Sequence, residues 1–116
     1  MRRYDITSEG YDHMDKHTAL ENAKIYAAEV RKVFSPFAIV FYGSYVNGTP
    51  TPESDIDIAV IFDKYNGDLL KDSAILWGLT MNISTLIEPM LFDRTQDAGK
   101  FIDDILNTGE ILYSVK

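Results

Sequence analysis

The sequence contains no cysteine at any of its 116 positions. The chain therefore forms no disulfide, has no thiolate nucleophile and holds no cysteine-ligated zinc ion. It also lacks an apolar run approaching the roughly 20 residues that cross a bilayer. The two arginines near its beginning are followed by no apolar stretch, so we do not expect them to open a secretory signal. We therefore expect a cytoplasmic protein with no membrane partner.

Basic residues are scarce, since 11 lysines and arginines face 18 acidic residues and give a formal net charge of -7. A protein that binds nucleic acids in general needs a basic face for the phosphate backbone, so we do not expect that function. The acidic balance fits a protein that recruits Mg²⁺ or docks on a basic partner. Hydrophobic content of 46% with 25% charged residues is typical of a globular chain of this length.

Helical and strand patterns alternate along the chain. We expect a loose arm over residues 1–15 and one domain over residues 16–116, because the periodic patterns begin only after the arm. The predicted helices cover residues 18–34, 69–81 and 98–107, and the predicted strands cover residues 37–42, 54–62, 83–92 and 110–115. This alternation indicates an α/β (α+β) fold, a single domain with a mixed β-sheet flanked by helices.

Several packing details follow from the same patterns. Leu70, Ala74, Trp77 and Met81 are expected to face inward from the second helix. Pro89 is expected to place the far end of the third strand at an edge or a bulge. In the last helix, Asp97 is the expected cap, Gly109 the expected stop, and the inward side chains are Phe101, Ile102, Ile105 and Leu106. Tyr26, Tyr42 and Trp77 are expected in the core.

The most informative pattern is the pair Gly43-Ser44, followed after ten residues by Asp55 and Asp57. Residues two apart on a strand face the same side, so the two carboxylates are predicted side by side. Their neighbours are apolar, and two like charges in apolar surroundings are costly unless a cation neutralises them. A divalent metal is the simplest such cation, and a nucleoside triphosphate bound at the Gly-Ser turn is the simplest reason to hold it there.

Transfer of a nucleotide from a triphosphate to a hydroxyl fits these residues. Two Mg²⁺ ions about 4 Å apart can activate the attacking hydroxyl and neutralise the leaving pyrophosphate. Asp55 and Asp57 supply the hard oxygen ligands that Mg²⁺ prefers. Gly43 lets the backbone approach a phosphate, and Ser44 adds a hydroxyl donor. If residues 44–48 begin a helical turn, their free amides also favour a phosphate.

The pattern of a Gly-Ser pair followed after ten residues by Asp-x-Asp resembles the signature of the DNA polymerase β-like nucleotidyltransferase superfamily. The spacing is that of the minimal single-domain members. The resemblance covers residues 18–115. It implies transfer of AMP from ATP to a hydroxyl, with Gly43 and Ser44 binding the triphosphate and Asp55 and Asp57 binding metal. Several minimal members are antitoxins that adenylylate a tyrosine of a small helical HEPN-type protein, so a partner of this type is implied.

A third acid from the neighbouring strand usually completes the family's site and acts as the general base. Glu88 is the candidate for this role, although the register of the strand could instead place Leu86 at that position. A second departure concerns residues 45–47, Tyr-Val-Asn, where many relatives carry arginines that meet the phosphates. Lys64 and Lys71 are the candidate substitutes.

Three functions remain open at this point. The first is a metal-dependent nucleotidyltransferase that modifies a hydroxyl, with a partner protein supplying the acceptor. The second is an antitoxin-like binding module that masks a HEPN-type partner without turnover, which the missing arginines and the uncertain third acid favour. The third is a catalytically degenerate sensor that binds ATP with Mg²⁺ and transfers nothing.

Overall fold

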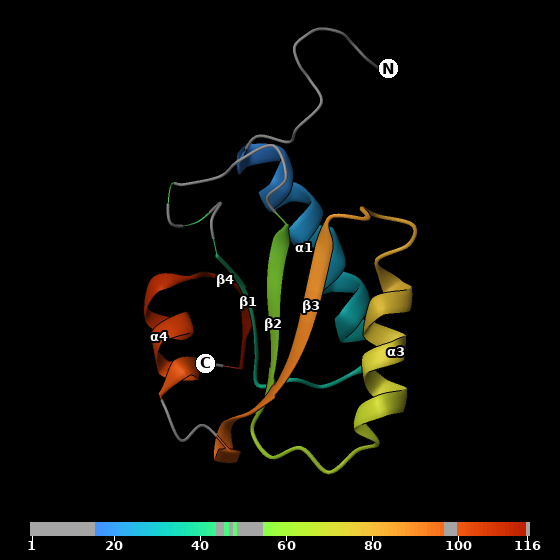
Figure 1. Cartoon of the computed structure of the whole chain (residues 1–116), viewed down its shortest axis with the longest axis vertical. Coiled ribbons are helices and arrows are strands. Elements are labelled where there is room, and N and C mark those ends of the chain that lie inside the picture. Colours follow the sequence, from blue (N-terminus) through green and yellow to red (C-terminus); the bar gives the residue numbers. More distant parts are fainter. Residues whose placement is uncertain (1–15, 44–45, 47, 49–54, 97–99, 116) are drawn as a thin grey trace, which may run out of the picture.

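A four-stranded sheet in the order β3-β2-β1-β4 forms the centre of the molecule (Figure 1). The computed structural model describes residues 16–43, 46, 48, 55–96 and 100–115. Strand β1 (Ala38–Tyr42) runs antiparallel to both β2 (Ile56–Phe62) and β4 (Glu110–Ser114), whereas β2 runs parallel to β3 (Ile87–Asp93). The sheet is therefore mixed, as the sequence predicts. The predicted arm, residues 1–15, lies outside the described residues.

Helices cover both faces of this sheet. Helices α1 (Lys16–Val33) and α3 (Leu69–Leu79) pack on one face, and the shorter α4 (Phe101–Thr108) packs on the other. A short 3-10 helix, η1 (Arg94–Gln96), follows β3. In the part of the chain that the structure describes, no helix has both the length and the apolar character needed to cross a membrane.

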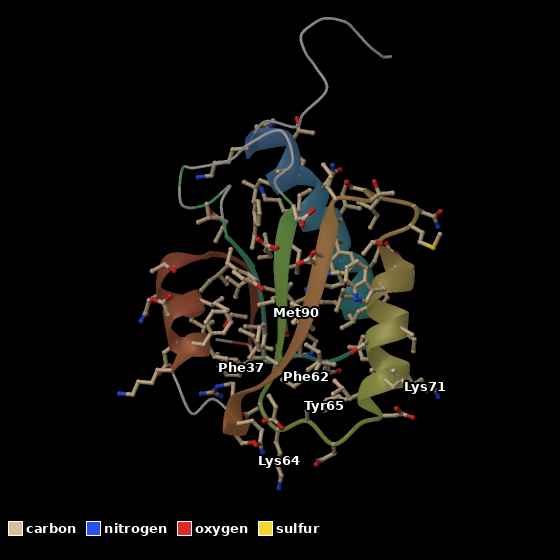
Figure 2. The ribbon with its side chains drawn as sticks, viewed as in Figure 1. Phe37, Phe62, Lys64, Tyr65, Lys71 and Met90 are labelled. Carbon is tan, nitrogen blue, oxygen red and sulfur yellow. The ribbon has the colours of Figure 1, made fainter. Side chains whose placement is uncertain are left out.

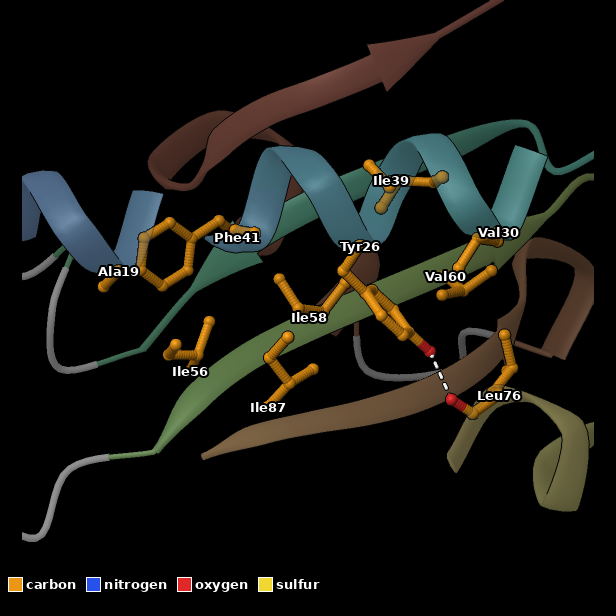
Figure 3. Close-up of a cluster of buried hydrophobic side chains, with 12 residues drawn as sticks. Ala19, Tyr26, Val30, Ile39, Phe41, Ile56, Ile58, Val60, Leu76 and Ile87 are labelled. Carbon is orange, nitrogen blue, oxygen red and sulfur yellow. Dashed lines mark hydrogen bonds between the residues drawn. The ribbon is translucent and has the colours of Figure 1, made fainter. Parts of the chain in front are cut away.

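The larger core lies between the sheet and α1 (Figure 3). Alternate residues of β1 and β2 point into it, and Tyr26 of α1 is fully buried there, as predicted. The Tyr26 hydroxyl donates a hydrogen bond of 2.7 Å to the carbonyl oxygen of Leu76 in α3. Because an unpaired buried hydroxyl is costly, this bond fixes α3 against α1 as well as satisfying the tyrosine.

The predicted inward face of α3 is wrong. Leu70, Ala74, Trp77 and Met81 are all exposed, and the residue that α3 buries is Leu76. The helix carries apolar residues around most of its circumference, so periodicity alone does not identify the face that packs. The contact with Tyr26 selects the side centred on Leu76.

Two further predictions concern the edges of the fold. Pro89 lies in β3 opposite Ile58, and β3 is an edge strand, where a missing N–H is tolerated. Gly109 ends α4 as predicted, with its N–H donating to the Ile105 carbonyl oxygen at 2.8 Å. Its backbone is extended rather than left-handed, and a Cβ there would overlap Val40, so close packing accounts for this glycine. The predicted cap, Asp97, lies outside the described residues.

Helix α4 covers only part of its face of the sheet. It packs over β1, with Ile102 and Ile105 buried as predicted, while Phe101 is half exposed instead of inward. On the same face Met90 of β3 is 45% exposed (Figure 2). Ala59 and Ile61 of β2 are fully buried under α4 on this face, whereas its β3 edge and the partly exposed Asp57 and Glu88 are not covered. We call this uncovered part the open face, and the candidate site lies there.

Candidate active site

Three acidic residues and a tyrosine meet on the open face of the sheet. Asp57 of β2 lies opposite Glu88 of β3 in the parallel pair and opposite Tyr42 of β1 in the antiparallel pair. Directly opposed residues on neighbouring strands have Cβ atoms about 5 Å apart. Since β2 is flanked on both sides, Asp57 is on an interior strand and not on a solvated edge.

Asp55 extends this group at the beginning of β2. It is exposed and immediately precedes the strand. Its carboxyl group is close enough to act on Glu88: burial, followed by the negative charge of Asp55 and hydrogen bonding with it, raises the pKa of Glu88.

Asp57 has the most perturbed carboxyl group of the three. Burial, followed by the charges of Glu88 and Asp55, raises its pKa from 3.8 to about 6. Every charged group that shifts this pKa is acidic, so nothing among these neighbours neutralises the cluster. A bound cation would remove the repulsion and return the carboxylates to their charged forms.

The donor set suits a hard divalent cation. Carboxylate oxygens are ligands that Mg²⁺ prefers, and it is commonly held by one or two of them together with phosphates and water. Among the residues described, no three carboxylate or imidazole groups already converge as a complete metal-binding cluster. Asp55 and Asp57 could therefore hold such an ion only with further ligands from phosphate oxygens and solvent.

Gly43 lies directly against this cluster. Its φ of +90° belongs to the left-handed region, and a Cβ added to it would overlap the carboxylate of Asp57. Both facts require glycine here, and together they leave bare backbone beside the acids. The Gly43 carbonyl oxygen accepts a 3.1 Å hydrogen bond from the N–H of Val46, which closes a turn after β1. Ser44 lies outside the described residues.

The register of β3 against β2 determines whether Glu88 or Leu86 stands beside Asp57. Glu88 occupies that position, because Ile87 pairs with Ile56 and Glu88 with Asp57. Leu86 precedes the strand, is partly buried and packs against the core cluster of α1 and α3. Its carbonyl oxygen accepts the Ile56 N–H at 2.8 Å, which begins the pairing of the two strands.

Tyr42 belongs to this site, although its sequence suggests only a core residue. It is half-buried, and burial followed by the charges of Asp57 and Glu88 raises its pKa to about 12. Its hydroxyl is therefore a stable donor beside the carboxylates at neutral pH. Tyr42 and Gly43 also line a cavity of about 160 Å³ under α4. The sequence places Tyr42 directly before the glycine turn, and this position could have pointed to a role in the site. That Asp57 is its neighbour depends on the register between β1 and β2, which the sequence does not show.

The two candidate lysines do not reach the site. Asp57 is near the beginning of β2, whereas Lys64 follows the end of that strand and Lys71 lies in the first turn of α3 (Figure 2). Five residues of strand from Asp57 to Phe62 span roughly 17 Å. Both lysines are at the opposite end of the sheet, so the prediction that they replace the missing arginines is wrong.

Carboxylates on adjacent strands beside a glycine turn, on an open face of a mixed sheet, are the arrangement expected of a metal-dependent phosphoryl- or nucleotidyl-transferring domain. Comparison with known proteins agrees: residues 24–116 match the family described as "Polymerase beta, Nucleotidyltransferase", and the chain belongs to this family. No curated protein matches the chain.

Two solved structures share the fold. One is a protein from Sulfolobus solfataricus provisionally assigned as a nucleotidyltransferase, with a TM-score of 0.61 and 20% identity, covering 86% of this chain and 84% of that one. The other is a toxin-antitoxin structure with AMP-PNP, with a TM-score of 0.56 and 19% identity, covering 89% of this chain and 76% of that one. At these identities the likeness establishes the fold.

Proposed function

We propose that this protein transfers AMP from ATP to a hydroxyl group of a partner protein, in a reaction that depends on Mg²⁺. The observation that carries the proposal is the pairing of Glu88 with Asp57 on the open face, with Asp55 in contact and Gly43 adjacent. Membership of the nucleotidyltransferase family supports the reaction class.

The roles of the acids follow from their positions. Asp55 and Asp57 would hold the metal, which neutralises the triphosphate and makes the acceptor hydroxyl easier to deprotonate when it is bound. The acceptor oxygen attacks the α-phosphorus, a new oxygen–phosphorus bond forms, and the bond to the bridging oxygen breaks so that pyrophosphate leaves. Glu88 would accept the proton of the hydroxyl, since its carboxylate stands directly beside Asp57 on the neighbouring strand.

Gly43 and Ser44 would hold the triphosphate. The bare backbone at Gly43 allows a phosphate to approach the carboxylates as closely as a shared metal ion requires. Ser44 would contribute its hydroxyl. The Tyr42 hydroxyl, held protonated, is a further donor next to the same carboxylates.

A protein acceptor is supported by one structural neighbour. The neighbour with AMP-PNP is a toxin-antitoxin structure. We therefore propose a small helical, HEPN-type protein as the acceptor.

Transfer from ATP labelled at the α-phosphate tests this proposal. The chain, Mg²⁺ and the product of the neighbouring gene are incubated together, and label is expected on the protein acceptor. Asp57→Asn and Glu88→Gln are expected to remove the label, while the exposed acid Asp103 provides a matched control as Asp103→Asn. Equal labelling with all three variants would contradict the proposal.

A second function, masking a partner without turnover, is favoured by the charges at the site, because among the described residues no basic side chain shifts the pKa of Asp57 or Glu88. The lysines that could meet the phosphates lie at the far end of β2. If this function is the correct one, Asp57→Asn protein binds and inhibits the partner as well as the unchanged protein does. If inhibition instead requires both ATP and Asp57, transfer is the function. ATP binding measured by calorimetry without pyrophosphate release would indicate a sensor.

A further inference from the structure

One side of α3 presents large apolar side chains to solvent. Leu70, Trp77 and Met81 are 84%, 47% and 77% exposed, and Ala74 is exposed between them. The spacing of three and four residues aligns Leu70, Ala74 and Trp77 along one side of the helix, and Met81 follows two residues after the helix ends at Leu79. We call these four residues the α3 stripe. Isolated apolar side chains on a surface are ordinary, whereas a contiguous row marks an interaction surface.

Gly78 is a second feature of this surface, next to the α3 stripe. It lies within α3, and a Cβ there would meet no atom within 4 Å. The fold therefore gains nothing from glycine at this position, and alanine would make the helix about 1 kcal/mol more stable. A glycine at this point does permit another backbone to approach α3 closely. It borders a groove of about 280 Å³ between α1 and α3, whose lining includes Ile25 and Glu29.

The exposed apolar area is close to what a dimer needs. The exposed fractions of Leu70, Trp77, Met81 and Ile25, which is 51% exposed, add up to about two and a half large side chains. At about 200 Å² for each, they offer about 500 Å². This is a little below the roughly 600 Å² per partner at the lower end of standard interfaces, so polar residues around the apolar patch have to supply the remainder.

We propose that two copies of this chain associate by packing their α3 stripes against each other, antiparallel and related by a two-fold axis. Such an interface must be self-complementary, because both copies use the same surface. Lys71 is exposed in the first turn of α3, while Glu29 of α1 borders the groove beside Gly78 and Asn82 at the other end of α3. Antiparallel packing brings Lys71 of each copy toward Glu29 of the other, which already pairs with Lys32 of its own helix at 2.8 Å, so the association rests on the apolar contact and not on this charge pair.

The net charge predicts how this dimer responds to salt. Each copy carries a formal charge of -7, so two copies repel each other at long range. Salt screens that repulsion and leaves the apolar contact in place. Association is therefore expected to strengthen between about 0.05 and 0.5 M salt, whereas an interface built on ion pairs would weaken over the same range.

Sedimentation and fluorescence together test the proposal on the unmodified chain. Trp77 is the only tryptophan, so the intrinsic emission reports directly on the α3 stripe. As the concentration rises from about 1 to about 300 μM, the mass is expected to approach twice 13.2 kDa while the emission moves to shorter wavelength. A chain that remains a monomer throughout overturns the proposal. So does a dimer in which Trp77 emission stays unchanged.

Variants that keep Trp77 locate the interface. Leu70→Lys and Met81→Lys each alter both halves of a two-fold contact, and each is expected to weaken association by on the order of 100-fold. Ile111→Lys is the control, because Ile111 is similarly exposed at 48% but lies on β4 at the opposite side of the sheet. Equal weakening by the control overturns the assignment to α3.

Gly78→Ala separates association from the stability of the fold. Helix propensity predicts that it raises the thermal stability of the dilute monomer. Close helix approach predicts that it weakens the dimer at the same time. Unchanged association would overturn the antiparallel packing at Gly78.

Discussion

Asp57→Asn is expected to make the ligand-free protein more stable above pH 6, although it removes a residue of the proposed site. The folded protein holds the Asp57 proton with a pKa of about 6, compared with 3.8 for an ordinary aspartate. A pKa raised in the folded state contributes stability that is complete below about pH 4 and is lost as the pH rises through about 6. At neutral pH the folded protein therefore holds a repelled carboxylate, which asparagine lacks.

The size of the effect follows from the pKa. A rise from 3.8 to about 6 corresponds to at most about 3 kcal/mol in the free energy of unfolding. Asp57 is partly exposed, so solvent screens part of this repulsion. We therefore expect Asp57→Asn to raise the free energy of unfolding by about 1 to 2 kcal/mol at pH 8.

Urea unfolding of both proteins, followed by circular dichroism at pH 5 and pH 8, measures this difference. Comparing the variant with the unchanged protein at each pH cancels the titration of all other groups. The stabilisation is expected at pH 8 and should become much smaller at pH 5, where Asp57 is largely protonated. A variant that is equally stable or less stable at pH 8 would refute the electrostatic account of the site.

Four further outcomes are expected. Mg²⁺ binding near pH 6 should release protons from the carboxylates. Calorimetry detects this release as a binding heat that varies with the ionisation enthalpy of the buffer, and Asp57→Asn should reduce that variation. Gly43→Ala should destabilise the fold and abolish ATP binding, because it adds both strain and an overlap with Asp57, whereas Gly48→Ala, with a φ of +83° and open space, should add strain alone. Equal losses from the two would contradict this. Glu88→Gln should retain ATP binding but lose transfer, so a variant with normal turnover would exclude Glu88 as the base. Tyr26→Phe should lower the free energy of unfolding by about 1 to 2 kcal/mol, and an unchanged denaturation midpoint would show that the buried hydrogen bond to α3 contributes nothing.

The sequence predicted the order of the elements because their periodic patterns are local. The helix expected over residues 18–34 is α1, and the two strands that flank the Gly-Ser turn are β1 and β2, within a few residues at each end. The mixed sheet and the nucleotidyltransferase family were also predictable, since a glycine turn and two acids on one strand form a pattern of fixed spacing. Each of these features depends on residues close together in the chain.

The wrong predictions concern places where the local sequence is compatible with more than one arrangement. Helix α3 is apolar on more than one side, so its pattern is compatible with burying either Trp77 or Leu76. The hydrogen bond from Tyr26, 50 residues away from Leu76, decides between them. The lysines were misplaced for a related reason, because closeness in sequence to β2 does not indicate which end of a strand a residue reaches.

The sequence by itself determined the family and the two aspartates, because spacing along one strand fixes which side chains share a face. The tertiary structure alone decided that Glu88 and Tyr42 stand on either side of Asp57. Register between β2 and β3 depends on contacts between segments about 30 residues apart, such as Asp57 and Glu88, and no local pattern encodes it. The same packing left the α3 stripe on the surface, since one helix can bury only the side that meets the core.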